Sequence, residues 1–140
     1  VQAPFFVPDT PATPRNPIYL NSADGFDVPK AFTPTVVVDI DAVADKKFQC
    51  IAAMPSQFGD ADSWQGRTLP NMPKDDAGRK AYILKTVQGW LASAADAYRP
   101  QLIARYGPER GAKVKYAEAF QLNQYGRQVK PEELDTLLPR

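Results

Sequence analysis

Residues 35–40, Thr-Val-Val-Val-Asp-Ile, form the most strongly β-prone stretch of this chain. Valine and isoleucine are branched at Cβ and favour strands, and apolar side chains fall on both faces of this stretch. A strand that is apolar on both faces is typical of the interior of a sheet. The stretch therefore predicts a buried, internal strand.

A helix is expected directly after this strand. Val43, Ile51 and Met54 recur at helical spacing and predict a helix through residues 46–53, which Pro55 ends. Cys50 lies beside this apolar stripe and is expected in the core as a small apolar residue. The remaining regular elements are a long helix with Ile83, Val87, Trp90, Leu91 and Ala94 on one face, a short segment ending at Gly107, a strand over 114–122 and a terminal helix from Pro131.

Proline and glycine mark the irregular parts of the chain. Half of the 14 prolines fall within residues 1–34, which predicts an extended arm with a short strand at 17–20. Residues 58–80 contain several glycines and prolines and are expected to form a long surface loop. The order strand, helix, loop, helix, strand predicts part of an α/β sandwich, with all of 1–140 in one domain.

Composition excludes several classes of function. Lysine and arginine number 17 against 16 acidic residues, a balance that argues against a nucleic-acid-binding protein. No apolar run is long enough to span a membrane. With no histidine and one cysteine, the chain has no histidine-dependent catalytic pair and no zinc site of the usual kind. The compartment, cytoplasmic or exported, stays open.

Three carboxylates follow the strand, at Asp39, Asp41 and Asp45. Ligands of open α/β sheets bind at the carboxyl ends of strands, and three oxygen ligands can hold a hard cation. Acidic residues at a helix N-terminus, placed there for capping and for the helix dipole, are the simpler interpretation. The capping interpretation is favoured because no calcium-loop glycine or glutamate follows.

Ser56, Gln57 and Trp64 lie beyond this helix. Ser56 and Gln57 are suited to hydrogen-bonding a polar ligand, or they satisfy the end of their own helix. Trp64 is either an aromatic platform over a pocket or an anchor that fixes the loop to the core. The pair Lys46 and Lys47 is expected to be solvated.

Glu118 interrupts the otherwise apolar strand Tyr-Ala-Glu-Ala-Phe at residues 116–120. A buried carboxylate requires a partner or a function. We therefore expect Glu118 to be buried and hydrogen-bonded, on the same side of the sheet as Ser56 or Gln57. The alternative is a surface ion pair with a nearby lysine or arginine.

Several of these motifs, in this order, resemble the C-terminal half of the LmbE-like (PIG-L, GlcNAc-PI de-N-acetylase) family. The family has a segment of the type Asp-Val-Val-Val-Asp-Ile, then a helix ending in His-x-Ser-Gln, and later Glu-Trp-Leu and Tyr-Ala-Glu-Ala-Phe. The matching parts here are 36–40, Lys46 and Lys47, 56–57, 63–64 and 116–120, with 7–11 and 16–20 similar to the mid-chain connection. Met54 stands where the family commonly has the histidine.

The resemblance implies a Rossmann-like three-layer α/β sandwich of which this chain is the C-terminal portion. It implies a hydrolase that removes acetyl groups from N-acetylglucosamine-type substrates, with one zinc ion that polarises the amide and activates water. The family's zinc ligands and base lie in His-Pro-Asp-Asp-Glu and His-x-Asp-His motifs, and neither is present here. Zinc is therefore expected in the complete protein and not in this chain alone, which has no catalytic residue of its own.

Two classes of function follow from the resemblance. In the first, the chain supplies the substrate wall and lid of an N-deacetylase, through Ser56, Gln57, Trp64 and Glu118. Its partner is then a missing N-terminal part or a second polypeptide, and its substrate a small amidosugar. In the second, the chain is a non-catalytic binding or structural module of the same fold that has lost the metal site.

Overall fold

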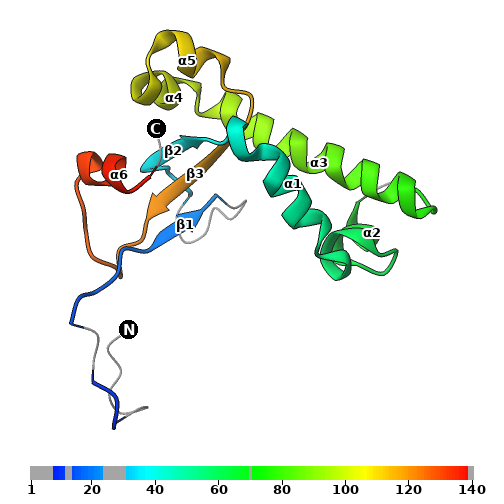
Figure 1. Ribbon diagram of the computed structural model, residues 1–140, viewed down its shortest axis with the longest axis horizontal. Helices are drawn as coiled ribbons and strands as arrows, with labels where there is room; N and C mark the ends of the chain where they lie inside the picture. Colours follow the sequence, from blue (N-terminus) through cyan, green and yellow to red (C-terminus); the bar gives the residue numbers. More distant parts are fainter. Residues whose placement is uncertain (1–7, 12–13, 24–30, 70, 139–140) are drawn as a thin grey trace. The chain divides into compact units, whose positions relative to one another are not determined.

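The computed structural model describes residues 8–11, 14–23, 31–69 and 71–138 and shows a mixed α/β protein (Figure 1). Within these residues, three strands form one sheet in the order β1-β3-β2. Between them in sequence lie a 3-10 turn (η1), a π-helical turn (η2) and five of the six α-helices found in the described residues. The bounds are β1 Leu20–Ser22, β2 Val36–Asp39, η1 Asp41–Val43, α1 Ala44–Ala52, η2 Pro55–Gly59, α2 Trp64–Thr68, α3 Asp76–Ala97, α4 Arg99–Tyr106, α5 Pro108–Lys113, β3 Ala117–Leu122 and α6 Pro131–Leu137.

The sheet is antiparallel throughout its described part. β1 pairs with β3 in the register Leu20↔Leu122 and Ser22↔Phe120. On the other side of β3, the Thr35 N–H donates to the Phe120 carbonyl at 2.8 Å and the Ile40 N–H donates to the Tyr116 carbonyl at 3.1 Å, so β2 and β3 run in opposite directions.

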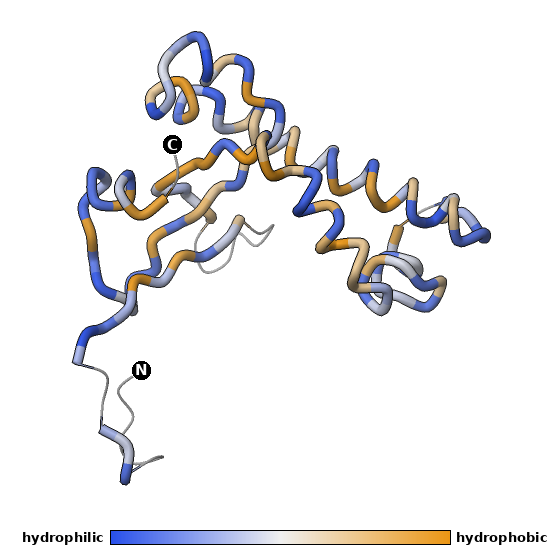
Figure 2. The backbone as a smooth tube through the Cα atoms, viewed as in Figure 1, coloured by the Kyte–Doolittle hydropathy of each residue, from blue (hydrophilic) through white to orange (hydrophobic). Residues whose placement is uncertain are grey.

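β2 forms where the valine run predicts a strand, but within the described sheet it lies at an edge and β3 is in the middle. Its three valines are nevertheless all buried, and Figure 2 shows most of β2 in the orange of hydrophobic residues. Apolar residues on both faces of a strand indicate that other parts of the protein cover both faces. They do not indicate whether the strand is internal, because an internal strand needs a hydrogen-bonded neighbouring strand at each of its two edges. The prediction of an internal strand is therefore wrong for the described sheet, although the prediction of burial is confirmed.

The described residues divide into two compact units. One contains the residues up to Val36 together with those from Ala119 onward, and the other is Val37–Glu118. In the first unit, β1 and β3 pair and α6 contributes Leu134, which is 1% exposed. Much of the Pro-rich arm (1–7, 12–13 and 24–30) lies outside the described residues, and its strand covers Leu20–Ser22 rather than 17–20.

The unit Val37–Glu118 has a core between α1 and α3. Ala44 and Phe48 of α1 pack with Ile83 and Val87 of α3 in one buried cluster. Each helix contributes two residues four positions apart, because that spacing returns side chains to one face of a helix. α3 begins at its N-cap Asp75, whose carboxylate accepts a 2.7 Å hydrogen bond from the Gly78 N–H.

Three sequence predictions in this unit are wrong in detail. Cys50 is exposed, because the buried face of α1 runs through Ala44 and Phe48 and position 50 points elsewhere. Val43 and Met54 lie just outside the two ends of α1 and are exposed as well. Trp90, placed on the core face of α3 from its spacing, is 48% exposed.

The segment 58–80 is more regular than the predicted loop. It contains α2 and the start of α3, and Arg79 fastens it by donating to the Gly59 carbonyl at 3.3 Å, to the Lys74 carbonyl and to Asp76. Ser63 caps α2 by accepting from the Gly66 N–H at 2.9 Å. No helix in the described part of the chain is both long and apolar enough to cross a membrane.

Candidate functional site

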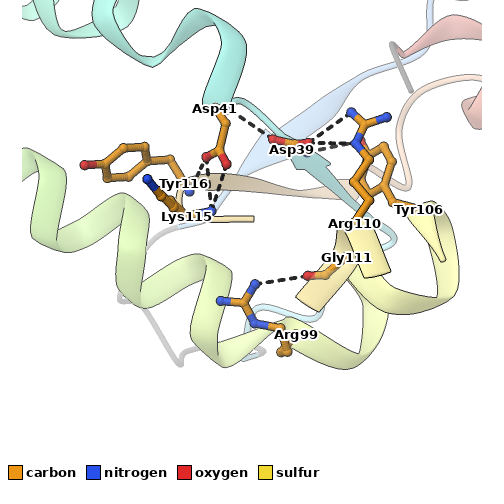
Figure 3. Close-up of polar contacts among 8 residues, drawn as sticks. All are labelled: Asp39, Asp41, Arg99, Tyr106, Arg110, Gly111, Lys115 and Tyr116. Carbon is orange, nitrogen blue, oxygen red and sulfur yellow. Dashed lines mark hydrogen bonds and ion pairs between the residues drawn. The ribbon is translucent and has the colours of Figure 1, made fainter. Parts of the chain in front are cut away.

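The carboxyl end of β2 carries a network of charged side chains (Figure 3). Asp39 is the last residue of β2, and its side chain is only 10% exposed. One carboxylate oxygen accepts from the Nε and Nη2 atoms of Arg110 at 3.1 and 3.0 Å, and the other accepts from the Asp41 N–H at 2.9 Å. Charge-assisted bonds of this kind are stronger than neutral ones. They therefore tie α5 to the end of β2.

Tyr106, at the end of α4, completes this arrangement. Its hydroxyl oxygen accepts the Asp39 N–H at 3.1 Å, and the Arg110 guanidinium lies 4.4 Å from the centroid of its ring. A cation over an aromatic face contributes about 0.5–1 kcal/mol at an exposed position. The consecutive helices α4 and α5 therefore meet β2 at Asp39, 67 to 71 positions away in sequence.

Asp41 holds the chain that leads into β3. Its carboxylate accepts the Lys115 N–H, with distances of 3.1 and 3.0 Å to the two oxygens, and the Tyr116 N–H at 2.7 Å. Neither η1 nor α1 has a side-chain N-cap, so the capping part of the favoured interpretation is wrong for Asp41. Asp41 and Asp45 do lie in the first turns of η1 and α1, as the helix-dipole part of that interpretation expects. Tertiary contacts, absent from any local pattern, provide the hydrogen-bond partners of Asp41.

A hollow of about 360 Å³ opens beside these carboxylates. The side chains of Glu109 and Lys113, on its wall, make no hydrogen bond or ion pair within the described parts of the chain. The Glu109 carboxylate can therefore accept hydrogen bonds from a polar ligand, and the Lys113 ammonium group can donate them. The wall is formed by Asp39, Asp41, Glu109, Arg110, Lys113 and Val114.

The residues present do not fit a zinc ion. The chain contains no histidine, and its single cysteine is exposed. Within the residues that the structure describes, no group of three metal-ligating side chains comes together. Asp39 and Asp41 are already engaged by Arg110 and by backbone N–H groups. Protein zinc sites are built mainly from histidine and cysteine, so this chain lacks the required donor set.

Glu118 forms an ion pair with Lys47 of α1, 71 positions away in sequence. The Glu118 and Lys47 side chains are 30% and 34% exposed. Glu118 is therefore hydrogen-bonded but only partly buried. Its partner is a lysine, so the structure agrees with the alternative prediction of an ion pair with a lysine or arginine. Lys47 is correspondingly not the freely solvated residue expected from the sequence.

We expect the Lys47–Glu118 pair to couple by about 0.5–1 kcal/mol, because a half-exposed ion pair is partly screened by water. The measurement is a double-mutant cycle with Lys47→Met and Glu118→Gln, read from urea unfolding. Lys46→Met, at the exposed neighbouring position, is the matched control. Additivity of the two substitutions within error would contradict the prediction.

The other predicted site residues are displayed at the surface. Ser56 and Gln57 lie in η2, where both are exposed, and no hydrogen bond engages either side chain among the described residues. Trp64 is the first residue of α2 and is 56% exposed, so it does not anchor its segment to the core. Its neighbours Ser63 and Gln65, 2% and 1% exposed, are the buried residues there.

Sequence reasoning missed Arg110, Tyr106 and the acceptor role of Asp41. Arg110 follows Gly107 and Pro108, which predict only the end of a helix, so α5 itself was not expected, and Tyr106 is one of several tyrosines. No spacing within either segment indicates that both contact β2. No protein-family model, curated protein or solved structure matches this chain.

Proposed function

We propose that this chain is the C-terminal part of an LmbE-like N-deacetylase acting on small N-acetylglucosamine-type substrates. Its role there is to supply part of the substrate wall, while the zinc ligands and the base belong to residues outside the chain. The proposal includes a Rossmann-like sandwich for the complete protein. A β2 strand that is buried on both faces suits such a larger sheet.

The Lys47–Glu118 ion pair carries the proposal. Two of the segments on which the resemblance rests are the Lys46–Lys47 helix and the Tyr-Ala-Glu-Ala-Phe strand, and this contact joins them across 71 positions. A shared tertiary contact gives a reason for both motifs to occur together in one chain. The polar hollow at the end of β2 adds support, because donors and acceptors of mixed charge suit the hydroxyl groups of a sugar.

The proposal assigns exposed residues to the substrate side. Ser56 and Gln57 have unused donors and acceptors, and Trp64 presents an exposed ring of the kind that stacks on sugars. Glu118 takes a supporting role through its lysine partner. None of these residues is assigned proton transfer or metal binding.

The test is to read the coding sequence on the amino-terminal side of Val1 and to express the complete protein. We expect His-Pro-Asp-Asp-Glu and His-x-Asp-His motifs, about one zinc ion per protein by metal analysis, and release of acetate from an N-acetylglucosamine-type substrate. The 140-residue chain purified alone is expected to hold no stoichiometric zinc and to release no acetate, since it lacks the donor set.

Zinc bound stoichiometrically by the 140-residue chain would contradict the assignment of the metal to other residues. A complete protein without the two histidine motifs, and without zinc or acetate release, would overturn the deacetylase proposal. That second result would favour the non-catalytic module. Trp64→Ala in the active protein is the matched probe of the substrate wall, expected to raise KM more than it lowers kcat.

A further inference from the structure

An apolar pocket of about 270 Å³ opens between α1, η2 and α3, all within the unit Val37–Glu118. We call it the α1–α3 pocket. Its walls are apolar side chains from the three elements: Phe48, Ile51, Phe58, Ile83, Leu84 and Val87. It does not adjoin the polar hollow at the end of β2, with which it shares no lining residue.

The floor of the α1–α3 pocket is the core itself. Phe48, Ile83 and Val87 belong to the buried cluster that joins α1 to α3, and Phe58 packs against that cluster while only partly buried. Leu84, higher on the wall, is 40% exposed. Apolar concave surface that stays open to water is characteristic of ligand sites.

Among the described residues that line the pocket, one is charged. Lys80 lines the pocket one helical turn before Ile83 and Leu84, so its side chain leaves α3 on the same face of the helix. Among the described residues the Lys80 side chain makes no ion pair or hydrogen bond, and no acidic residue lines the pocket. Gln49 adds an amide at the rim. A cationic side chain at the rim and an apolar interior are complementary to a ligand with an anionic group at one end and an apolar group at the other.

The volume restricts the ligand further. Pockets for drug-sized ligands occupy about 300–1,000 Å³, so a pocket of 270 Å³ is too small for a nucleotide cofactor. A single unbranched alkyl chain fits a narrow apolar space of this size. The almost wholly apolar interior excludes a sugar, whose hydroxyl groups would lose their hydrogen bonds.

We propose that the α1–α3 pocket binds a medium-chain carboxylate, with its alkyl chain against Phe48, Ile83 and Val87 and its carboxylate at Lys80. This inference goes beyond the deacetylase proposal and does not depend on it. The bound ligand would cover Leu84 and Ile51, and it would leave Ser56, Gln57 and Trp64 free.

The test is a titration of the full ¹⁵N-labelled chain with sodium octanoate, followed by amide chemical shifts. We expect saturable shifts confined to α1, η2 and α3. Octylamine, with the same chain length and the opposite charge, is expected to bind about tenfold more weakly, because its ammonium group faces Lys80. Absence of saturable shifts with octanoate, or equal binding of octylamine, would overturn the proposal.

Two pairs of variants test the binding mode. Lys80→Met is expected to weaken octanoate binding about threefold and to remove the preference over octylamine, whereas Lys85→Met, exposed on the same helix outside the pocket, leaves both unchanged. Ala52→Trp places an indole in the pocket and abolishes binding, and Ala53→Trp, one position outside it, does not. If Lys80→Met and Ala52→Trp both bind octanoate like the unchanged chain, the site is not this pocket.

Discussion

Gly111→Ala is expected to lower the free energy of unfolding by about 3 kcal/mol. A Cβ atom at position 111 would lie 2.5 Å from the Ile103 Cα and 2.5 Å from the Leu102 carbonyl oxygen. Both are backbone atoms, so no side-chain rotation relieves the clash and α4 and α5 must move apart. Leu102, which is 0% exposed, would lose its close packing in that movement.

Gly89→Ala is the matched control, since a Cβ at position 89 would meet nothing within 4 Å. Glycine inside a helix is less favourable than alanine by about 0.5–1 kcal/mol, so this substitution in α3 should stabilise the chain. Urea unfolding followed by circular dichroism measures both effects. A Gly111→Ala chain as stable as the unchanged one would show that α4 and α5 are not in backbone contact.

Asp41→Ala is expected to lower the free energy of unfolding by about 2 kcal/mol. The substitution removes the carboxylate that accepts the backbone N–H groups of Lys115 and Tyr116. Water can replace the acceptor at exposed Lys115, but Tyr116 is partly buried and its ring packs edge-on against Phe48, with 5.6 Å between the ring centroids. Loss of this hydrogen bond is therefore expected to loosen the packing of Tyr116 against Phe48, which belongs to the core between α1 and α3.

Two further variants define the contribution of this carboxylate. Asp41→Asn keeps one acceptor oxygen and is expected to cost about half as much as Asp41→Ala. Asp45→Ala, at an exposed position four residues on, should change stability by no more than about 0.5 kcal/mol. Equal effects of Asp41→Ala and Asp45→Ala on the unfolding midpoint would refute the role of Asp41.

The helices and strands followed from local pattern where that pattern was strong. The valine run gave β2, the spacing of Ile83 and Val87 gave the buried face of α3, and Pro131 marks the start of α6. The apolar pattern gave wrong predictions of burial where they depended on the exact ends of a helix. Val43 and Met54 matched a helical stripe that extends past both ends of α1, and the prediction for Cys50 depended on that stripe.

The candidate site was predicted in part. The sequence indicated Asp39 and Asp41 as candidate site residues because they are acidic and follow a predicted strand. It indicated Glu118 because this residue is the one charge in an otherwise apolar strand. Their particular partners could not be predicted, because these lie 67 to 75 positions away and carry no local signal: Tyr106 and Arg110 for Asp39, the Lys115 and Tyr116 N–H groups for Asp41, and Lys47 for Glu118. A charge pattern identifies a group that needs a partner, but the tertiary fold selects which partner it has.

The sequence by itself determined the mixed α/β character, the positions of the main helices and β2, and the absence of a zinc donor set. Those properties depend on residue type and on spacings of a few residues, which act locally. Only the tertiary structure decided that β3 lies between β1 and β2, that Asp41 binds the chain before β3, and that α1 and α3 leave an apolar pocket open. Each of these results depends on which distant segments come into contact, and hydrophobic burial, being non-directional, does not specify that from sequence pattern alone.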